Sequence, residues 1–158
     1  MGMILDLTLV LPCYNDGELL EASLREIQHT LSQTRYTYEI ILIDDCSPDG
    51  SAETVRRIAA KHDTIRSICH PTNIGRGGTV VEGMLAADGR VVGFIDVDLE
   101  VHCRYIPAMV GAIEQGYDGA TAHRIYRLQW VPSMVFRAFL SVAYRKLVRY
   151  LLQLPYQD

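Results

Sequence analysis

Residues 92–102, VGFIDVDLEVH, join an apolar run to three acidic residues at alternate positions. The apolar run ends at Ile95, and Asp96, Asp98 and Glu100 follow it. Alternate residues of an extended chain point to the same side, so these carboxylates are expected to converge where a buried strand reaches the surface. Carboxylates in one cleft repel one another unless a positive group lies among them. The stretch therefore predicts a strand that ends at a cation-binding site.

Apolar runs and helical patterns alternate along the rest of the chain, with no internal repeat. The expected strands are residues 7–12, 38–44, 65–69, 90–96 and 118–126. The expected helices are residues 17–33, 51–62, 77–87, 105–116 and 132–154. Continuous apolar strands separated by helices predict an α/β fold, with a mostly parallel sheet and helices on both faces. Ligands of such sheets bind beyond the carboxyl ends of the strands.

Polar segments follow the first four expected strands, at the edge where such a ligand would bind. They are PCYND (12–16), DDCSPDG (44–50), NIGRGG (73–78) and DVDLE (96–100). A dinucleotide-binding fold is excluded because it needs G-x-G-x-x-G directly after the first strand, and a nucleotide-binding P-loop motif is absent. A receiver-type phospho-switch also clusters acids at strand ends, but it has no evident need for the Asp-x-Asp pair.

The Asp-x-Asp pair fits either a solvated acidic turn or a metal site. An isolated pair of this kind is common by chance and would favour the turn. Here it directly follows a strand expected to be buried on both faces, opposite a second acidic strand end. Mg²⁺ and Mn²⁺ prefer carboxylate oxygens and are often shared with substrate phosphates. We therefore expect a metal ion at Asp96 and Asp98 that holds a diphosphate, with Arg76 on a glycine-rich loop as a further phosphate contact.

The composition is that of an ordinary globular domain. A chain of 158 residues is about the size of one domain, and its net charge of -4 argues against a general nucleic-acid binder. No signal peptide and no apolar run long enough to span a bilayer is evident, which predicts a cytoplasmic location. The cysteines have no metal-ligand spacing and are expected to be mostly buried free thiols in a reducing compartment. They are Cys13, Cys46, Cys69 and Cys103.

Four segments resemble one known family when they are taken together. VLPCYNDGE, EIILIDDCSPDGS, NIGRGG and FIDVDLE occur in the order and spacing of the inverting glycosyltransferases of family 2. The resemblance covers residues 7–158 and is greatest to the dolichyl-phosphate mannosyltransferase and polyprenyl-phosphate glycosyltransferase branch. It implies the GT-A fold, a Rossmann-like α/β sheet, as a single nucleotide-sugar-binding catalytic domain over residues 1–158. Further elements follow the position of Asp158 in that family, so the resemblance implies a domain that is incomplete at its C-terminus.

The resemblance also implies roles for individual residues. Pro12, Tyr14 and Asp16 would pack on the base and ribose of the donor, and Asp45, with Asp44 beside it, would hold the base. With Arg76 and Asp96, the expected donor-binding set is Pro12, Tyr14, Asp16, Asp44, Asp45, Arg76 and Asp96. The expected metal ligands are Asp96, Asp98 and Glu100. The expected catalytic residues are Asp98, Arg124 and Arg137, of which the two arginines would meet donor or acceptor phosphates.

The implied reaction moves a sugar, with inversion, from a nucleotide diphosphate donor to a polyprenyl or dolichyl phosphate, with Mg²⁺ or Mn²⁺ as cofactor. Similarity to the mannosyltransferase branch favours GDP-mannose, and a UDP-hexose is the alternative donor. An acceptor that is already an anion needs no strong general base, and His62, His70 and His102 are expected to be surface or turn residues. The alternatives from other classes are a non-catalytic nucleotide-sugar-binding homologue and a peripheral membrane interaction protein.

The last expected helix, residues 132–154, carries a polar stripe along an otherwise apolar surface. Polar side chains recur every four residues at Ser133, Arg137, Ser141, Arg145, Arg149 and Gln153. This pattern fits a helix packed on the sheet with one side exposed to solvent, or a helix lying at the interface of a membrane. An enzyme that uses a lipid phosphate must work at such a surface, so a peripheral position on the cytoplasmic membrane face is expected.

Overall fold

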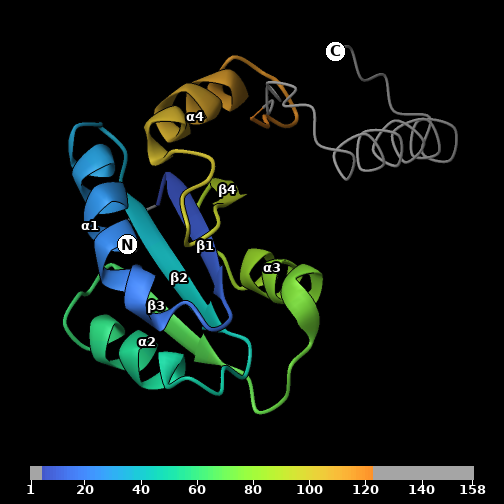
Figure 1. The fold of residues 1–158 in the computed structure, drawn as a ribbon. Helices are drawn as coiled ribbons and strands as arrows, with labels where there is room; N and C mark the ends of the chain where they lie inside the picture. Colours follow the sequence, from blue (N-terminus) through green and yellow to red (C-terminus); the bar gives the residue numbers. More distant parts are fainter. Residues whose placement is uncertain (1–4, 123–158) are drawn as a thin grey trace, which may run out of the picture. The chain divides into compact units, whose positions relative to one another are not determined.

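The computed structural model describes residues 5–122 of the chain, which form a parallel sheet with helices packed on it (Figure 1). The described strands are β1 (Leu7–Cys13), β2 (Tyr38–Asp44), β3 (Ile65–Cys69) and β4 (Val91–Phe94). Their order in the sheet is β3-β2-β1-β4, and every neighbouring pair is parallel. The expected α/β fold with a parallel sheet is confirmed.

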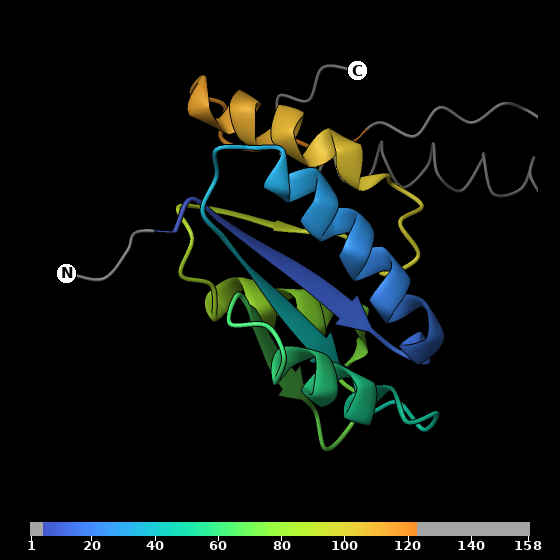
Figure 2. The same ribbon diagram turned by 90° about the vertical axis from the view of Figure 1, so that its left-hand side faces the viewer.

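Helices cover both faces of this sheet. They are α1 (Gly17–Ser32), α2 (Ser51–Ala59), α3 (Gly75–Leu85) and α4 (Ile106–Glu114), with a short 3₁₀ turn η1 (Cys103–Tyr105) before α4. Figure 1 shows α1 and α2 on one side of the sheet and α3 on the other, and Figure 2 shows α4 beside α1. The helices α1, α2 and α4 share one apolar cluster with the sheet, whereas α3 packs near Val10 and Ile43 on the opposite face.

The strand β2 shows why the central strands read as continuous apolar runs. Ile40 and Leu42 point into the cluster with α1 and α2, and Ile41 and Ile43 point to the α3 face. All four side chains are fully buried. Because both faces of the strand are covered, apolar side chains are favoured at successive positions, so its sequence does not alternate between apolar and polar residues.

The strand β4 is shorter than the sequence predicts and lies at the edge of the described sheet. It covers Val91–Phe94 rather than residues 90–96, and Phe94 is 46% exposed. The expectation that this strand is buried on both faces is wrong for the described residues, because none of the four residues of β4 is fully buried there. Residues 118–122 form no strand, and the rest of the predicted strand 118–126 and the helix 132–154 lie outside the described residues.

The helix α3 begins two residues earlier than the sequence predicts. Its first turn contains the glycine-rich segment, so Arg76 lies on a helix and not on a loop. The carboxylate of Asp45, at the end of β2, accepts hydrogen bonds from the backbone N–H groups of Ile74 and Gly75. A side chain from a distant part of the chain thus satisfies N–H groups that have no partner within the helix.

A buried carboxylate links three strands of the sheet. Glu39 on β2 accepts hydrogen bonds from Thr8 Oγ1 (2.7 Å), from Arg66 Nε (2.7 Å) and from the backbone N–H of Asp88 (2.9 Å). Burial alone would raise the pKa of Glu39, but these hydrogen bonds and the charge of Arg66 hold the pKa below its ordinary value. The side chain therefore stays ionised inside the sheet at neutral pH.

Residues 5–122 contain no helix that is both long enough and apolar enough to cross a membrane. The prediction of buried free thiols is correct for Cys13 and Cys103, while Cys69 is partly buried and Cys46 is exposed. Burial raises the pKa of the Cys13 thiol to about 11.

Candidate functional site

A pocket of about 560 Å³ lies at the carboxyl ends of β1, β2 and β4. Its walls come from the loops that follow these strands and from the beginning of α3. The lining residues are Pro12, Cys13, Tyr14, Asp16, Asp45, Asn73, Gly75, Arg76, Thr79, Asp96, Val97 and Asp98. The pocket therefore occupies the edge of the sheet at which a ligand was expected.

Arg76 and Asp96 hold each other at the wall of this pocket. Nε of Arg76 donates to Oδ1 of Asp96 at 2.8 Å, and Nη2 donates to Oδ2 at 2.7 Å. The guanidinium also lies over the ring of Phe94, 5.5 Å from its centroid. The positive group next to Asp96 is therefore an arginine of the same chain. Both side chains of the pair are more than 40% exposed, so the pair contributes little stability and can open when a ligand competes.

Asp98 offers a carboxylate oxygen to the pocket. Its Oδ1 accepts the backbone N–H of Glu100 at 3.0 Å, and its Oδ2 has no partner among the described residues. Val97, between the two aspartates, is buried, so the chain turns its apolar side chain inward and keeps both carboxylates at the pocket. Asp96 and Asp98 are thus placed so that both carboxylates can bind the same ligand in the pocket.

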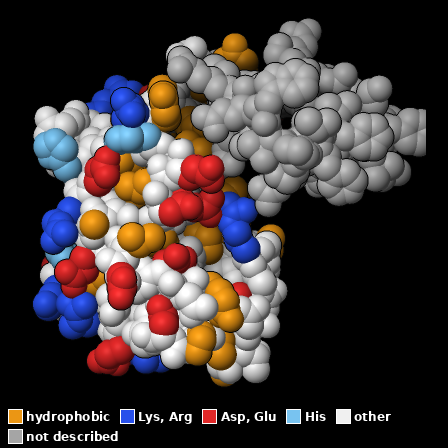
Figure 3. Space-filling view, viewed as in Figure 1, with side chains coloured by type: hydrophobic (Ala, Val, Ile, Leu, Met, Phe, Trp, Pro, Cys, Tyr) orange, Lys and Arg blue, Asp and Glu red, His pale blue; other side chains and the backbone are white. Residues whose placement is uncertain are grey.

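The charge of the lining is predominantly negative. Among residues 5–122, the lining carries Asp16, Asp45, Asp96 and Asp98 and one basic residue, Arg76. Figure 3 shows acidic and basic side chains close together on the surface of the described part. Carboxylate oxygens are the ligands that Mg²⁺ and Mn²⁺ prefer, so the residues present fit a divalent cation. A diphosphate entering this pocket without such a cation would meet more negative than positive charge.

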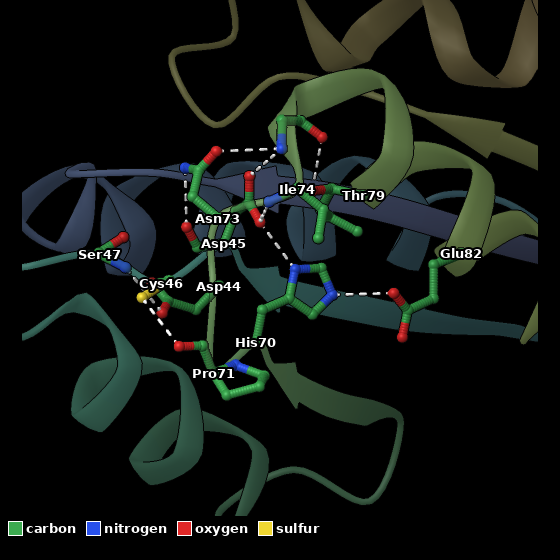
Figure 4. A network of polar contacts seen from close by, with 11 residues as sticks. Asp44, Asp45, Cys46, Ser47, His70, Pro71, Asn73, Ile74, Thr79 and Glu82 are labelled. Carbon is green, nitrogen blue, oxygen red and sulfur yellow. Dashed lines mark hydrogen bonds and ion pairs between the residues drawn. The ribbon is translucent and has the colours of Figure 1, made fainter.

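Asp45 lies at the centre of a buried network behind the pocket (Figure 4). Its Oδ1 accepts from the Ile74 N–H at 2.9 Å and contacts Nδ1 of His70 at 2.8 Å, and its Oδ2 accepts from the Gly75 N–H at 2.8 Å. Asn73 adds a hydrogen bond from Nδ2 to the backbone carbonyl of Asp45. Burial would raise the pKa of Asp45, but the hydrogen bonds from His70 and the two N–H groups hold it below its ordinary value.

His70 is part of this network, and the expectation that it is an ordinary surface or turn residue is wrong. It directly follows β3, and its side chain is 7% exposed. Its Nε2 lies 2.9 Å from Oε2 of Glu82 on α3, although the contact lacks hydrogen-bond geometry. No local sequence signal marks His70, because its partners come from β2 and α3. By contrast, His62 is exposed and His102 is partly exposed, as expected.

Three loops around the pocket each contain a non-glycine residue with left-handed backbone. These residues are Asn15 (φ 60°), Cys46 (φ 61°) and Leu99 (φ 51°), which follow β1, β2 and β4. Asparagine tolerates this conformation, whereas each of the other two costs on the order of 1–3 kcal/mol. Backbone strain of this kind persists where the surrounding structure imposes it, and it is enriched at ligand sites.

The structure brings together seven of the residues predicted for the site. They are Pro12, Tyr14, Asp16, Asp45, Arg76, Asp96 and Asp98. Asn73 and Thr79 also line the pocket, and the sequence did not single them out.

The other predicted residues do not line the pocket or cannot be placed. Asp44 is buried away from the lining, and its Oδ2 accepts from the Ser47 N–H, so it closes the turn after β2. Glu100 is exposed and is not among the lining residues. Arg124 and Arg137 lie outside the described residues.

Comparison with known proteins gives the following matches. The family model described as glycosyl transferase family 2 matches residues 8–149. A glycosyltransferase from Haloferax volcanii, AglD, is 31% identical over 161 residues, which cover 97% of this chain and 25% of that protein. An undecaprenyl-phosphate 4-deoxy-4-formamido-L-arabinose transferase from Aeromonas hydrophila is 36% identical over 112 residues, which cover 70% of this chain and 34% of that protein. The chain thus spans about a quarter to a third of the length of these relatives.

Two solved structures share the fold of the described residues. A mannosyltransferase from Pyrobaculum calidifontis, in complex with GDP-Man and Mn²⁺, matches with a TM-score of 0.51 and 24% identity, covering 61% of this chain and 28% of that one. The protein TarS (residues 1–349) from S. aureus, in complex with UDP, matches with a TM-score of 0.54 and 19% identity, covering 75% of this chain and 38% of that one. These likenesses confirm the expected fold of the GT-A type.

Proposed function

Because the chain belongs to glycosyl transferase family 2, we propose that it carries the nucleotide-sugar-binding part of a glycosyltransferase. The proposed reaction transfers a sugar, with inversion, from a nucleoside diphosphate donor to a polyprenyl or dolichyl phosphate. The donor is GDP-mannose or a UDP-hexose. The undecaprenyl-phosphate sugar transferase among the relatives supports this class of acceptor.

The observation that carries the proposal is the acidic pocket at the carboxyl ends of the strands. Four carboxylates and one arginine of the described part of the chain line it. A cation would offset the repulsion between these carboxylates and a nucleoside diphosphate, and the oxygen ligands of Asp96 and Asp98 suit Mg²⁺ or Mn²⁺. A metal-dependent site for a diphosphate explains why acidic residues surround a ligand that is itself an anion.

The lining residues suit the successive parts of a nucleotide sugar. Tyr14, which is 49% exposed, offers a ring face to the base, with Pro12 beside it. Asp45 would accept a hydrogen bond from the base, and Asp16 would accept one from a ribose hydroxyl. These contacts would hold the nucleoside in one orientation, so that the diphosphate points toward the Asp-x-Asp pair.

The chemistry at the other end of the pocket concerns the leaving group. A divalent cation held by Asp96 and Asp98 would supply charge neutralisation for the departing nucleoside diphosphate. Arg76 is near enough to Asp96 to contribute a second positive charge at the same place. Sugar transfer of this type needs no covalent intermediate with the protein. The residues of the pocket therefore serve to bind and orient the donor.

The acceptor side of the proposal rests on residues outside the described part. Arg124 and Arg137 would meet donor or acceptor phosphates, and a polyprenyl phosphate would bring the protein to the cytoplasmic surface of a membrane. The same proposal treats residues 1–158 as belonging to a single GT-A domain, of which residues 5–122 hold the donor.

Calorimetric titration of the chain with UDP and with GDP, each with and without Mn²⁺, tests the proposal. We expect at least one of the two nucleotides to bind, and Mn²⁺ to strengthen that binding. If neither nucleotide binds in the presence of Mn²⁺, the proposed function is wrong. If one binds equally well with and without Mn²⁺, the metal-dependent part of the proposal is wrong.

A further inference from the structure

The buried network behind the pocket determines how many hydrogen bonds Asp45 can accept from a ligand. An ionised carboxylate has two oxygens with about four acceptor positions in total. Oδ1 of Asp45 already has two partners, Nδ1 of His70 and the N–H of Ile74. Oδ2 has one partner among the described residues, the N–H of Gly75. One acceptor position, on Oδ2, is therefore left for a ligand.

His70 is held so that it keeps its position on Oδ1 filled. Asp45 has a lowered pKa and is ionised at neutral pH, so it cannot donate, and Nδ1 of His70 must carry the proton between them. On the other side of the ring, Nε2 lies 2.9 Å from a carboxylate oxygen of Glu82. The backbone N–H of His70 is also fixed, because it donates to the carbonyl of Asp44. The side chain of His70 is 7% exposed and Nδ1 is bonded to Asp45, so the ring has little freedom to turn away from Asp45.

We propose that His70 and the first turn of α3 leave Asp45 a single acceptor position for the donor base, so that the pocket selects uracil over guanine. The inference rests on the proposed function and decides between its two donors. His70 acts here as a positioning residue, because its contact is with Asp45 and not with the ligand.

The two bases differ in what they present to a carboxylate. Guanine offers two adjacent N–H groups, which need both oxygens of the carboxylate for a paired contact. Uracil offers one ring N–H, which needs one acceptor position. If guanine bound here, its second N–H would face Oδ1 of Asp45, whose acceptor positions are already used by His70 and Ile74. A polar group left without a partner in this way weakens binding, and we expect UDP to bind about tenfold more tightly than GDP, or better.

The first arm of the test needs no substitution. The affinities of UDP and GDP for the unaltered chain are measured by calorimetry in the presence of Mn²⁺. Tighter binding of UDP is the expected result. Equal or tighter binding of GDP overturns the inference and leaves the proposed function standing. Binding of neither nucleotide overturns both, so the two failures are distinguishable.

The second arm tests His70 through matched variants. His70→Ala removes the donor to Oδ1 and frees an acceptor position, so the preference for UDP should fall toward unity. His70→Asn keeps an N–H near the place of Nδ1, and it should retain the preference. His62→Ala, at an exposed histidine away from the pocket, is the control and should leave both affinities unchanged.

A role in folding alone gives a different pattern. In that case His70→Ala lowers the melting temperature, but the ratio of the UDP and GDP affinities stays at the unaltered value, and the role proposed for His70 is wrong. If His70→Ala does not fold, the first arm and His70→Asn still decide the matter. Loss of the preference in a folded His70→Asn variant would also contradict the proposed role.

Discussion

At the scale of single residues, Asp98 carries the clearest prediction for the metal site. Asp98→Asn removes one ligand charge at an exposed position, so the fold should be unaffected. Nucleotide affinity in the presence of Mn²⁺ should fall to the value measured without the metal. Asp63→Asn makes the same change of charge at an exposed turn and is the control. An Asp98→Asn variant that still responds to Mn²⁺ would show that the cation binds elsewhere.

Asp45 is predicted to matter for both binding and stability. A hydrogen bond to a charged acceptor contributes about 1.5–3 kcal/mol, so Asp45→Ala should weaken nucleotide binding by about ten- to a hundredfold. The same change leaves His70 and two N–H groups of α3 without their buried partner, which should cost about 3 kcal/mol of stability. Calorimetry and urea denaturation of the one variant measure the two effects. A loss of stability with unchanged affinity would restrict Asp45 to capping α3.

The cysteines should differ strongly in reactivity. Cys46 is exposed, whereas Cys13 is buried and has a pKa of about 11. The thiolate is the reactive form, so a thiol reagent at mildly alkaline pH should modify Cys46 rapidly and Cys13 only when the chain unfolds. Mass spectrometry of the modified peptides identifies the reacted residue. Rapid modification of Cys13 in the folded chain would contradict its burial at the end of β1.

At the scale of elements, the close packing of α3 on the sheet gives a matched pair of substitutions. A Cβ atom on Gly83 would collide with Val10 and would lie 2.8 Å from Cδ1 of Ile43. Gly83→Ala should therefore cost about 1–3 kcal/mol through overpacking. Gly111 lies on α4 with nothing within 4 Å of the same atom, so Gly111→Ala should stabilise the chain by about 0.5–1 kcal/mol. Urea denaturation of both variants measures the difference, and equal effects would refute this packing of α3.

The elements also show which features the sequence could predict. The bounds of β2 and β3 agree with the prediction, because each strand is a short extended segment between polar turns, and β2 is also almost continuously apolar. The beginning of α3 did not agree, since its cap comes from Asp45, thirty residues before Gly75. The role of His70 could not be predicted either, because its partners Asp45 and Glu82 are distant in the sequence. The Asp-x-Asp pair was visible because its spacing is local, while its pairing with Arg76 depends on how α3 packs.

At the scale of the whole molecule, the buried carboxylates predict sensitivity to acid. Glu39 and Asp45 both have a pKa below their ordinary values. A group of this kind stabilises the fold fully above its unfolded pKa, about 4.3 for Glu and 3.9 for Asp, and this stability is lost as the pH falls through the lower folded pKa. The free energy of unfolding should therefore be steady at neutral pH and fall steeply below about pH 4.

The variant Glu39→Gln separates the contribution of the sheet from that of the pocket. It removes the buried charge that Arg66 and the N–H of Asp88 stabilise, and it should cost about 3 kcal/mol at neutral pH. The acid-induced loss should also become smaller, because one of the two groups no longer titrates. Glu18→Gln, at an exposed position, is the control. An unchanged pH profile in Glu39→Gln would mean that other carboxylates cause the acid sensitivity.

The strand order β3-β2-β1-β4 has a consequence for synthesis on the ribosome. The strand β2 pairs with β1, β3 then pairs with β2, and β4 pairs with the free edge of β1. Each new strand thus finds a neighbour that has already left the exit tunnel. Since the described residues that line the pocket all lie between Pro12 and Asp98, this part of the pocket can form while residues beyond 122 are still being translated.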